Sequence, residues 1–227
     1  MPTRAASFTL PSRLVSLNMR SVPMLPDPMI AAVCVIAEHP FVSLMSDWCP
    51  KHWTRLQSFE LRCQVSDELQ ETASVGIRRG ASVFYLAKIE ARALFQIPSG
   101  IGQSLPANCT GIGKALLSAL TDVEIGELYP DPDDLPVMTA RSIRTLPDLR
   151  ADLATTRERG YAIEDGESTP GLHCAASVVR DVQGAVVAAI STSVPDVRWI
   201  SRSDAEWAAP VLAAAAELSA QLGYRAP

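Results

Sequence analysis

This chain of 227 residues contains only three histidines and has no net positive charge, since its formal net charge is −5. A uniformly basic surface for nucleic acid is therefore excluded, although one local basic face is compatible with this balance. The longest apolar run near the N-terminus, Met29 to Ala37, has about half the length of a membrane span. The ordered charged, apolar and small-residue regions of a secretory signal are also missing. These absences predict a cytoplasmic protein without a membrane partner.

Residues for nucleophilic or hydrolytic chemistry are also few. The sequence has no Gly-x-Ser-x-Gly motif. His173 and Cys174 are adjacent on a predicted strand, where neighbouring side chains point to opposite faces, so they cannot form a nucleophile–base pair. The stretch from Asn108 to Ala115 lacks the first glycine and the final hydroxyl of a phosphate-binding loop. We therefore expect no enzymatic activity and no cofactor.

The five cysteines are scattered and odd in number, which is typical of free thiols in a reducing compartment. Two interpretations remain for four Cys and His residues near the N-terminus, a zinc site or incidental neighbours. Their order is atypical of structural zinc sites and favours the second, so no metal is expected: Cys34, His39, Cys49 and His52.

The N-terminal region differs in composition from the rest of the chain. Residues 1–54 contain seven prolines, each of which removes an amide donor and restricts the preceding residue. Residues 1–60 hold five basic side chains against four acidic ones, a weak footprint for DNA. We expect an atypical proline-rich segment at 1–54, a linker helix within 55–72 and one domain at 73–227.

Within 73–227 the hydrophobic periodicity predicts strands first, then a helical middle, more strands and a final helix. Capping boxes and stop signals set the helix ends, and Pro210 should kink the final helix. Strands are expected at 73–78, 82–89, 93–97, 161–164, 172–180 and 185–194, and helices at 111–120, 121–128, 146–159 and 203–222. This order indicates an α+β fold with a largely antiparallel sheet flanked by helices.

A ligand pocket is predicted from two features of this domain. The loop from Leu105 leads directly into an apolar helix, so free backbone amides and the helix dipole should meet near Gly111 and attract an anion. If residue 180 pairs with 185, Cys174 lies opposite Ser191, and Ser193 shares that face by the two-residue period. Three small polar side chains would then line one face of the sheet. Packed core positions are the alternative.

Four stretches together resemble the effector-binding domain of the IclR family of bacterial transcriptional regulators. They are Leu105–Leu120, Gly160–Glu167, Gly171–Val179 and Ala188–Pro195. The resemblance covers about residues 55–224 and implies a GAF-like fold that binds a small organic acid. It also implies a homodimer or tetramer.

The resemblance assigns ligand-binding roles to positions that match the family pattern. Gly111 and Ile112 match the loop that offers amides to the effector, and Cys174, Ser191 and Ser193 match pocket positions of carboxylate-sensing members. Glu164, expected to be anionic and to contact the ligand's hydroxyl or hydrated carbonyl, stands where aspartate is usual.

Two departures from the family pattern affect what the resemblance implies. Asn108 stands where histidine is common, and the longer Glu164 side chain changes the expected ligand size. Residues 1–54 also lack a recognisable winged helix-turn-helix. DNA is therefore a partner only if a functional N-terminal domain exists. The alternative function is a stand-alone GAF-like ligand sensor that does not bind DNA.

Overall fold

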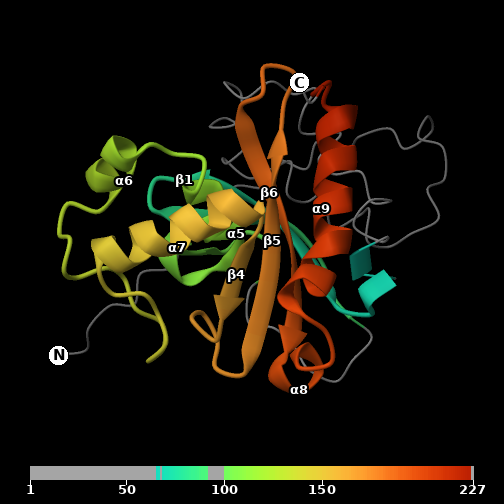
Figure 1. The fold of residues 1–227 in the computed structure, drawn as a ribbon, viewed down its shortest axis with the longest axis horizontal. Helices are drawn as coiled ribbons and strands as arrows, with labels where there is room; N and C mark the ends of the chain where they lie inside the picture. The colour runs from blue at the N-terminus through green and yellow to red at the C-terminus, as the bar shows by residue number, and fades with distance from the viewer. Residues whose placement is uncertain (1–64, 67, 92–99, 226–227) are drawn as a thin grey trace, which may run out of the picture. The chain divides into compact units, whose positions relative to one another are not determined.

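The computed structural model describes residues 65–66, 68–91 and 100–225, which form a six-stranded sheet with helices against it (Figure 1). Every neighbouring pair of strands is antiparallel, and the strand order is β3-β2-β1-β6-β5-β4. The predicted α+β fold with an antiparallel sheet is therefore confirmed. The strands are β1 Thr72–Arg79, β2 Ser82–Ile89, β3 Ser104–Pro106, β4 Ala162–Asp165, β5 Leu172–Arg180 and β6 Val186–Pro195.

The helices are η1 Ala107–Cys109, α5 Gly111–Leu117, α6 Asp122–Leu128, α7 Leu146–Arg159, α8 Asp196–Trp199 and α9 Asp204–Gln221. Side-chain caps begin four of them, α5, α6, α7 and α9. The predicted capping boxes are present at Thr121 and Ser203. Helix α7 starts after the Thr145 cap and ends at Gly160, whose φ of 82° is the left-handed conformation that glycine adopts readily.

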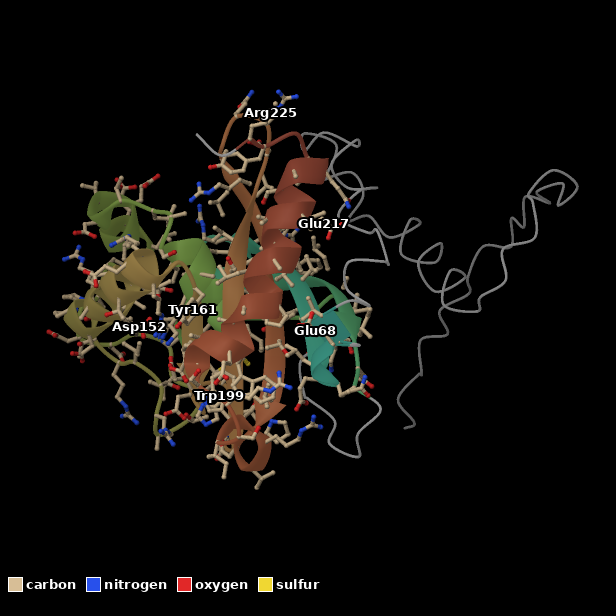
Figure 2. The ribbon with its side chains drawn as sticks, turned by 45° about the vertical axis from the view of Figure 1, so that its right-hand side comes forward. Glu68, Asp152, Tyr161, Trp199, Glu217 and Arg225 are labelled. Atoms are coloured by element: carbon tan, nitrogen blue, oxygen red, sulfur yellow. The ribbon has the colours of Figure 1, made fainter. Side chains whose placement is uncertain are left out.

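Helices cover both faces of the sheet (Figure 1). Helix α5 packs on β5 and β6, and a Cβ on Gly111 would lie 3.1 Å from the Cβ of Cys174. We call the side of the sheet that carries Cys174 the pocket face. Helix α9 packs on β5 and β6 from the other side, the α9 face, and Figure 2 shows Trp199 near the start of this helix.

The observed pairing of β5 with β6 differs from the predicted register. Cys174 pairs with Ser193, not with Ser191, which pairs with Ala176. The cause is local: the Asp181 carboxylate accepts the amides of Gln183 and Ala185, which keeps Ala185 in the turn. A bulge between Val179 and Arg180 then adds a further residue to the β6 side. The total displacement is two residues, so Ser191 and Ser193 stay on the predicted face.

Some predicted segments lie outside the described residues, and some elements differ from the prediction. The strand expected at 93–97, the Pro-rich segment 1–54 and the four Cys and His residues near the N-terminus lie outside the described residues. Of the linker helix only its end is described: residues 65, 66, 68 and 69 are helical. The helix expected at 111–120 ends at Leu117, and β3 and α8 are elements that the sequence did not predict. In the described part of the chain, none of the helices has the length and apolarity that crossing a bilayer requires.

Candidate functional site

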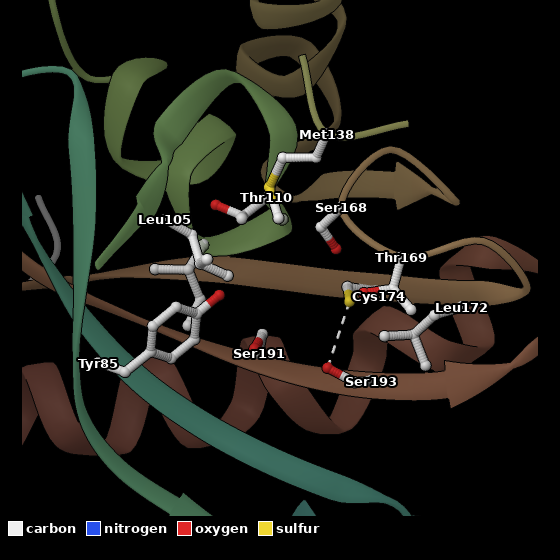
Figure 3. A pocket seen from close by; sticks show the side chains of 12 residues that line it. Tyr85, Leu105, Thr110, Met138, Ser168, Thr169, Leu172, Cys174, Ser191 and Ser193 are labelled. Carbon is white, nitrogen blue, oxygen red and sulfur yellow. Dashed lines mark hydrogen bonds between the residues drawn. The ribbon is translucent and has the colours of Figure 1, made fainter. Parts of the chain in front are cut away.

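A small cavity of about 120 Å³ lies between the pocket face and the start of α5 (Figure 3). In Figure 3 Thr110 and Met138 lie on one side of it, opposite the strands that carry Cys174, Ser191 and Ser193. Its lining combines apolar side chains with hydroxyl groups, a thiol and backbone. The lining residues are Tyr85, Leu105, Thr110, Gly111, Ile112, Met138, Ser168, Thr169, Leu172, Cys174, Ser191 and Ser193.

The floor of the cavity is the polar part of the β5–β6 hairpin. The thiol of Cys174 donates to the Ser193 hydroxyl over 3.2 Å. Burial is the main cause that raises the pKa of Cys174 well above its usual value, so this group is a neutral thiol. Ser191 follows two residues before Ser193 on the same face and is also buried. The floor therefore offers neutral hydrogen-bonding groups without a fixed charge.

The start of α5 forms the opposite wall. Thr110 caps this helix, and its hydroxyl accepts the Gly113 amide over 3.0 Å. The Lys114 amide donates to the Thr110 carbonyl. Gly111 and Ile112 are the first two helical residues, whose amides have no acceptor within a helix. Because Gly111 has no side chain, the backbone at the start of α5 can approach the sheet closely, and Gly111 and Ile112 line the cavity.

Two loops complete the site and are tied to one another. One provides Met138, and the other provides Ser168 and Thr169. The Thr139 hydroxyl donates to the Gly166 carbonyl over 2.7 Å, and the Ser142 hydroxyl donates to the Glu167 carbonyl over 2.7 Å. These bonds fix the two loops as one wall of the cavity.

A buried ion pair holds this wall against α5. The ammonium of Lys114, only 1% exposed, lies 2.6 Å from Glu167 and 3.2 Å from Asp152. Burial raises the pKa of Glu167, and the Lys114 charge opposes that rise. Removing one member of such a pair leaves an uncompensated buried charge, so the pair fixes the loop next to Ser168.

Glu164 lies behind the cavity rather than in its lining. It is fully buried on β4 and pairs across the strands with Cys174. Its Oε1 accepts the amides of Glu167 and Ser168 at 2.5 and 2.9 Å. Its Oε2 is buried and has no hydrogen-bond partner among the described residues. Burial raises the pKa of Glu164 to about 7, although the bonds to Ser168 and Cys174 lower it.

Five of the six predicted site residues line the cavity: Gly111, Ile112, Cys174, Ser191 and Ser193. Asn108, which departs from the family pattern, is buried and donates to the carbonyls of Pro136 and Ile143. It therefore positions the segment that precedes Met138, and it is absent from the lining.

The sequence reasoning missed the residues that reach the cavity from other elements. Thr110 carried a usable signal, since a threonine directly before a predicted helix is a preferred N-cap. Tyr85 is one of the alternate buried residues of β2, so it could have been assigned to a face by the two-residue period. Met138, Ser168 and Thr169 lie in loops without periodicity, so no comparable signal marked them.

His173 has separate contacts from Cys174, as the strand alternation predicts. Its Nε2 lies 2.8 Å from Asp196 and 3.3 Å from Asp165, and its ring stacks on Trp199. Among the described residues, no group of three or more His, Cys, Asp or Glu side chains has an arrangement that could hold a metal ion.

The geometry defines a class of protein: an α+β domain with a small, partly polar pocket between a sheet and a helix start, which suits a small ligand. The family model described as bacterial transcriptional regulator IclR C-terminal matches residues 60–220. The chain therefore belongs to the IclR family, and the match confirms the resemblance noted in the sequence.

Individual relatives agree with this assignment. The HTH-type transcriptional repressor AllR of Escherichia coli K12 is 33% identical over 156 residues, covering 69% of this chain and 57% of the relative. The chain thus spans little more than half of that relative's length.

Solved structures give the same result. The C-terminal domain of E. coli transcriptional regulator KdgR has a TM-score of 0.64 and 30% identity, covering 73% of this chain and 95% of that one. The putative transcriptional regulator RHA06195 from Rhodococcus sp. RHA1 has a TM-score of 0.67 and 28% identity, covering 72% and 67%.

Proposed function

We propose that this chain is the sensing part of a cytoplasmic transcriptional regulator, and that its pocket binds a small organic acid. The observation that carries the proposal is the composition of the cavity. Gly111 and Ile112, the first two residues of α5, line the same cavity as the buried residues Ser191 and Ser193. Backbone amides and hydroxyls are donors that a carboxylate can accept from. Each hydrogen bond to a charged group contributes about 1.5–3 kcal/mol to the binding free energy.

The size of the cavity restricts the acid. An engineered cavity of about 150 Å³ holds benzene, so the smaller volume of about 120 Å³ limits the ligand to at most about six non-hydrogen atoms. Leu105, Ile112 and Leu172 supply an apolar wall for the carbon atoms. A short hydroxy or keto acid such as lactate or pyruvate has the matching size and polarity.

Ligand binding would act through a population shift. A ligand that prefers one arrangement of paired sensing domains, in a homodimer or tetramer, would bias the segments that precede β1. Through an N-terminal domain those segments would control DNA. The name of the E. coli relative as an HTH-type repressor supports this role for that protein.

The test is a thermal-shift screen of the full chain with short hydroxy and keto acids. At least one acid should raise the melting temperature, and Ser191→Ala combined with Ser193→Ala should remove the rise because both hydroxyl donors are lost. Ser177→Ala is the matched control, since Ser177 is a buried serine on β5 outside the cavity lining. No shift with any acid, or a double variant that responds like the parent, would reject the pocket assignment.

A further inference from the structure

Glu164 is an unusual neighbour for a pocket that takes an anion. It is fully buried on the edge strand β4. Its cross-strand partner on β5 is Cys174, whose thiol lies at the floor of the cavity. One oxygen is used by the amides of Glu167 and Ser168, which fixes the carboxyl in place. The other oxygen, Oε2, is buried without a partner among the described residues. That oxygen is a site at which the carboxyl can hold a proton.

The surroundings do not compensate a negative charge at this position. The titratable groups that face Glu164 are Cys174 from β5, Glu167 from the following loop, Tyr85 from β2 and Cys109 from η1. Lys114, the buried cation of α5, is engaged by Glu167 and Asp152. No cationic side chain of the described residues is bonded to Glu164. Its charge is therefore stabilised only by neutral donors, the two amides and the Cys174 thiol.

We propose that the pocket binds an organic acid together with a proton from solvent, and that Glu164 holds this proton at Oε2. The inference rests on the proposed function. A carboxylate on the floor of the cavity and an ionised Glu164 behind it would be two like charges in a buried region, and such a pair does not ionise fully. The bound acid keeps its charge because amides and hydroxyls solvate it, so the proton goes to Glu164.

Burial raises the pKa of Glu164 to about 7 in the chain without ligand, so this carboxyl can take up a proton near neutral pH. Below that pH the carboxyl is already protonated and the acid binds without proton uptake. Above it each binding event takes up one proton, and the affinity should fall about tenfold per pH unit. By reciprocity the bound acid raises the pKa of Glu164 further.

The test is calorimetric titration of the full chain with lactate and pyruvate between pH 6 and 8.5, where carboxylic acids stay ionised. The wild-type Kd should rise about tenfold per pH unit above pH 7. The difference in binding enthalpy between phosphate and Tris buffers should correspond to the uptake of one proton. Glu164→Gln keeps an oxygen for the two amides and resembles the protonated acid, so its Kd should not depend on pH. Lactamide, the uncharged analogue, should give no proton uptake with either protein.

Glu158→Gln is the matched control, because Glu158 is an exposed glutamate on α7 and its removal changes the net charge equally. This variant should keep the wild-type pH dependence. A wild-type Kd for either acid that does not change above pH 7, or equal pH profiles for wild type and Glu164→Gln, overturns the inference alone. Absence of binding of both acids at every pH overturns the inference as stated for them, whereas the proposed function is rejected only if the whole acid screen gives no thermal shift.

Discussion

The pocket face and the α9 face of the sheet are built from alternate residues of the same strands, yet they are buried in different ways. Along β6 the pocket face carries Ser191 and Ser193, which are buried beside a cavity. The α9 face carries Ala188, Ile190 and Val194, which are fully buried under apolar cover. One strand therefore encodes a binding surface at every second residue and a hydrophobic core at the residues between them.

The difference shows how the two functions of the domain are separated. The α9 face excludes water and should supply most of the stability, in proportion to the apolar area removed from water. The pocket face keeps hydroxyls and a thiol in the lining of the cavity, at the cost of burying polar groups. Stability and ligand binding should accordingly respond to different substitutions.

The largest effect on stability is expected from Trp207→Ala on the α9 side. Trp207 is 2% exposed, stacks on Trp199 and donates its Nε1 to the Trp199 carbonyl over 2.9 Å. Truncating a buried tryptophan costs about 3–5 kcal/mol of unfolding free energy. Urea denaturation measures this loss, with Val197→Ala at an exposed position of α8 as a neutral control. A loss below about 1 kcal/mol would contradict the role assigned to the α9 face.

A pH-dependent effect of intermediate size is expected from Glu164→Gln on the pocket side. Burial raises the pKa of Glu164 from 4.5 to about 7 in the folded chain, whereas the unfolded chain keeps the ordinary value. The contribution of this carboxyl to stability is therefore fully present below about pH 4.5. It is lost as the pH rises to about 7, because the unfolded state releases the proton first.

The raised pKa corresponds to roughly 3 kcal/mol at 1.36 kcal/mol per pH unit. Glu164→Gln should thus match the wild type near pH 4 and exceed it in unfolding free energy near pH 8. Chemical denaturation at several pH values without ligand checks this. Glu158→Gln should follow the wild-type profile, and parallel curves for wild type and Glu164→Gln would show that Glu164 is ionised normally in the fold.

The two faces also differ in how far the sequence predicts them. The strand period of two residues places Cys174, Ser191 and Ser193 on one face even though the predicted pairing was displaced by two residues. The displacement came from the Asp181 side chain and the bulge at Val179, which depend on local bonds that composition does not reveal. An even displacement preserves the face, so the three residues line the cavity although the predicted register was incorrect.

The remaining parts of the site depend on tertiary contacts. The resemblance predicted a ligand-binding role for Glu164, but its Oε1 accepts the amides of Glu167 and Ser168. Met138 reaches the cavity because Asn108, Thr139 and Ser142 tie its loop to neighbouring segments. Bonds between segments that are distant in the sequence leave no periodic signal, so they could not be predicted from it.

The smallest effect, and the sharpest comparison of adjacent residues, is expected from Thr192→Val on the α9 face. Thr192 lies between Ser191 and Ser193, is fully buried, and its Oγ1 has no hydrogen-bond partner among the described residues. A buried hydroxyl without a partner reduces stability, and an apolar group of similar shape removes that penalty. Thr192→Val should therefore raise the unfolding free energy by about 1 kcal/mol and leave acid binding unchanged. Urea denaturation and the thermal-shift screen measure the two quantities, and a destabilised Thr192→Val would mean that this hydroxyl is bonded in the folded chain.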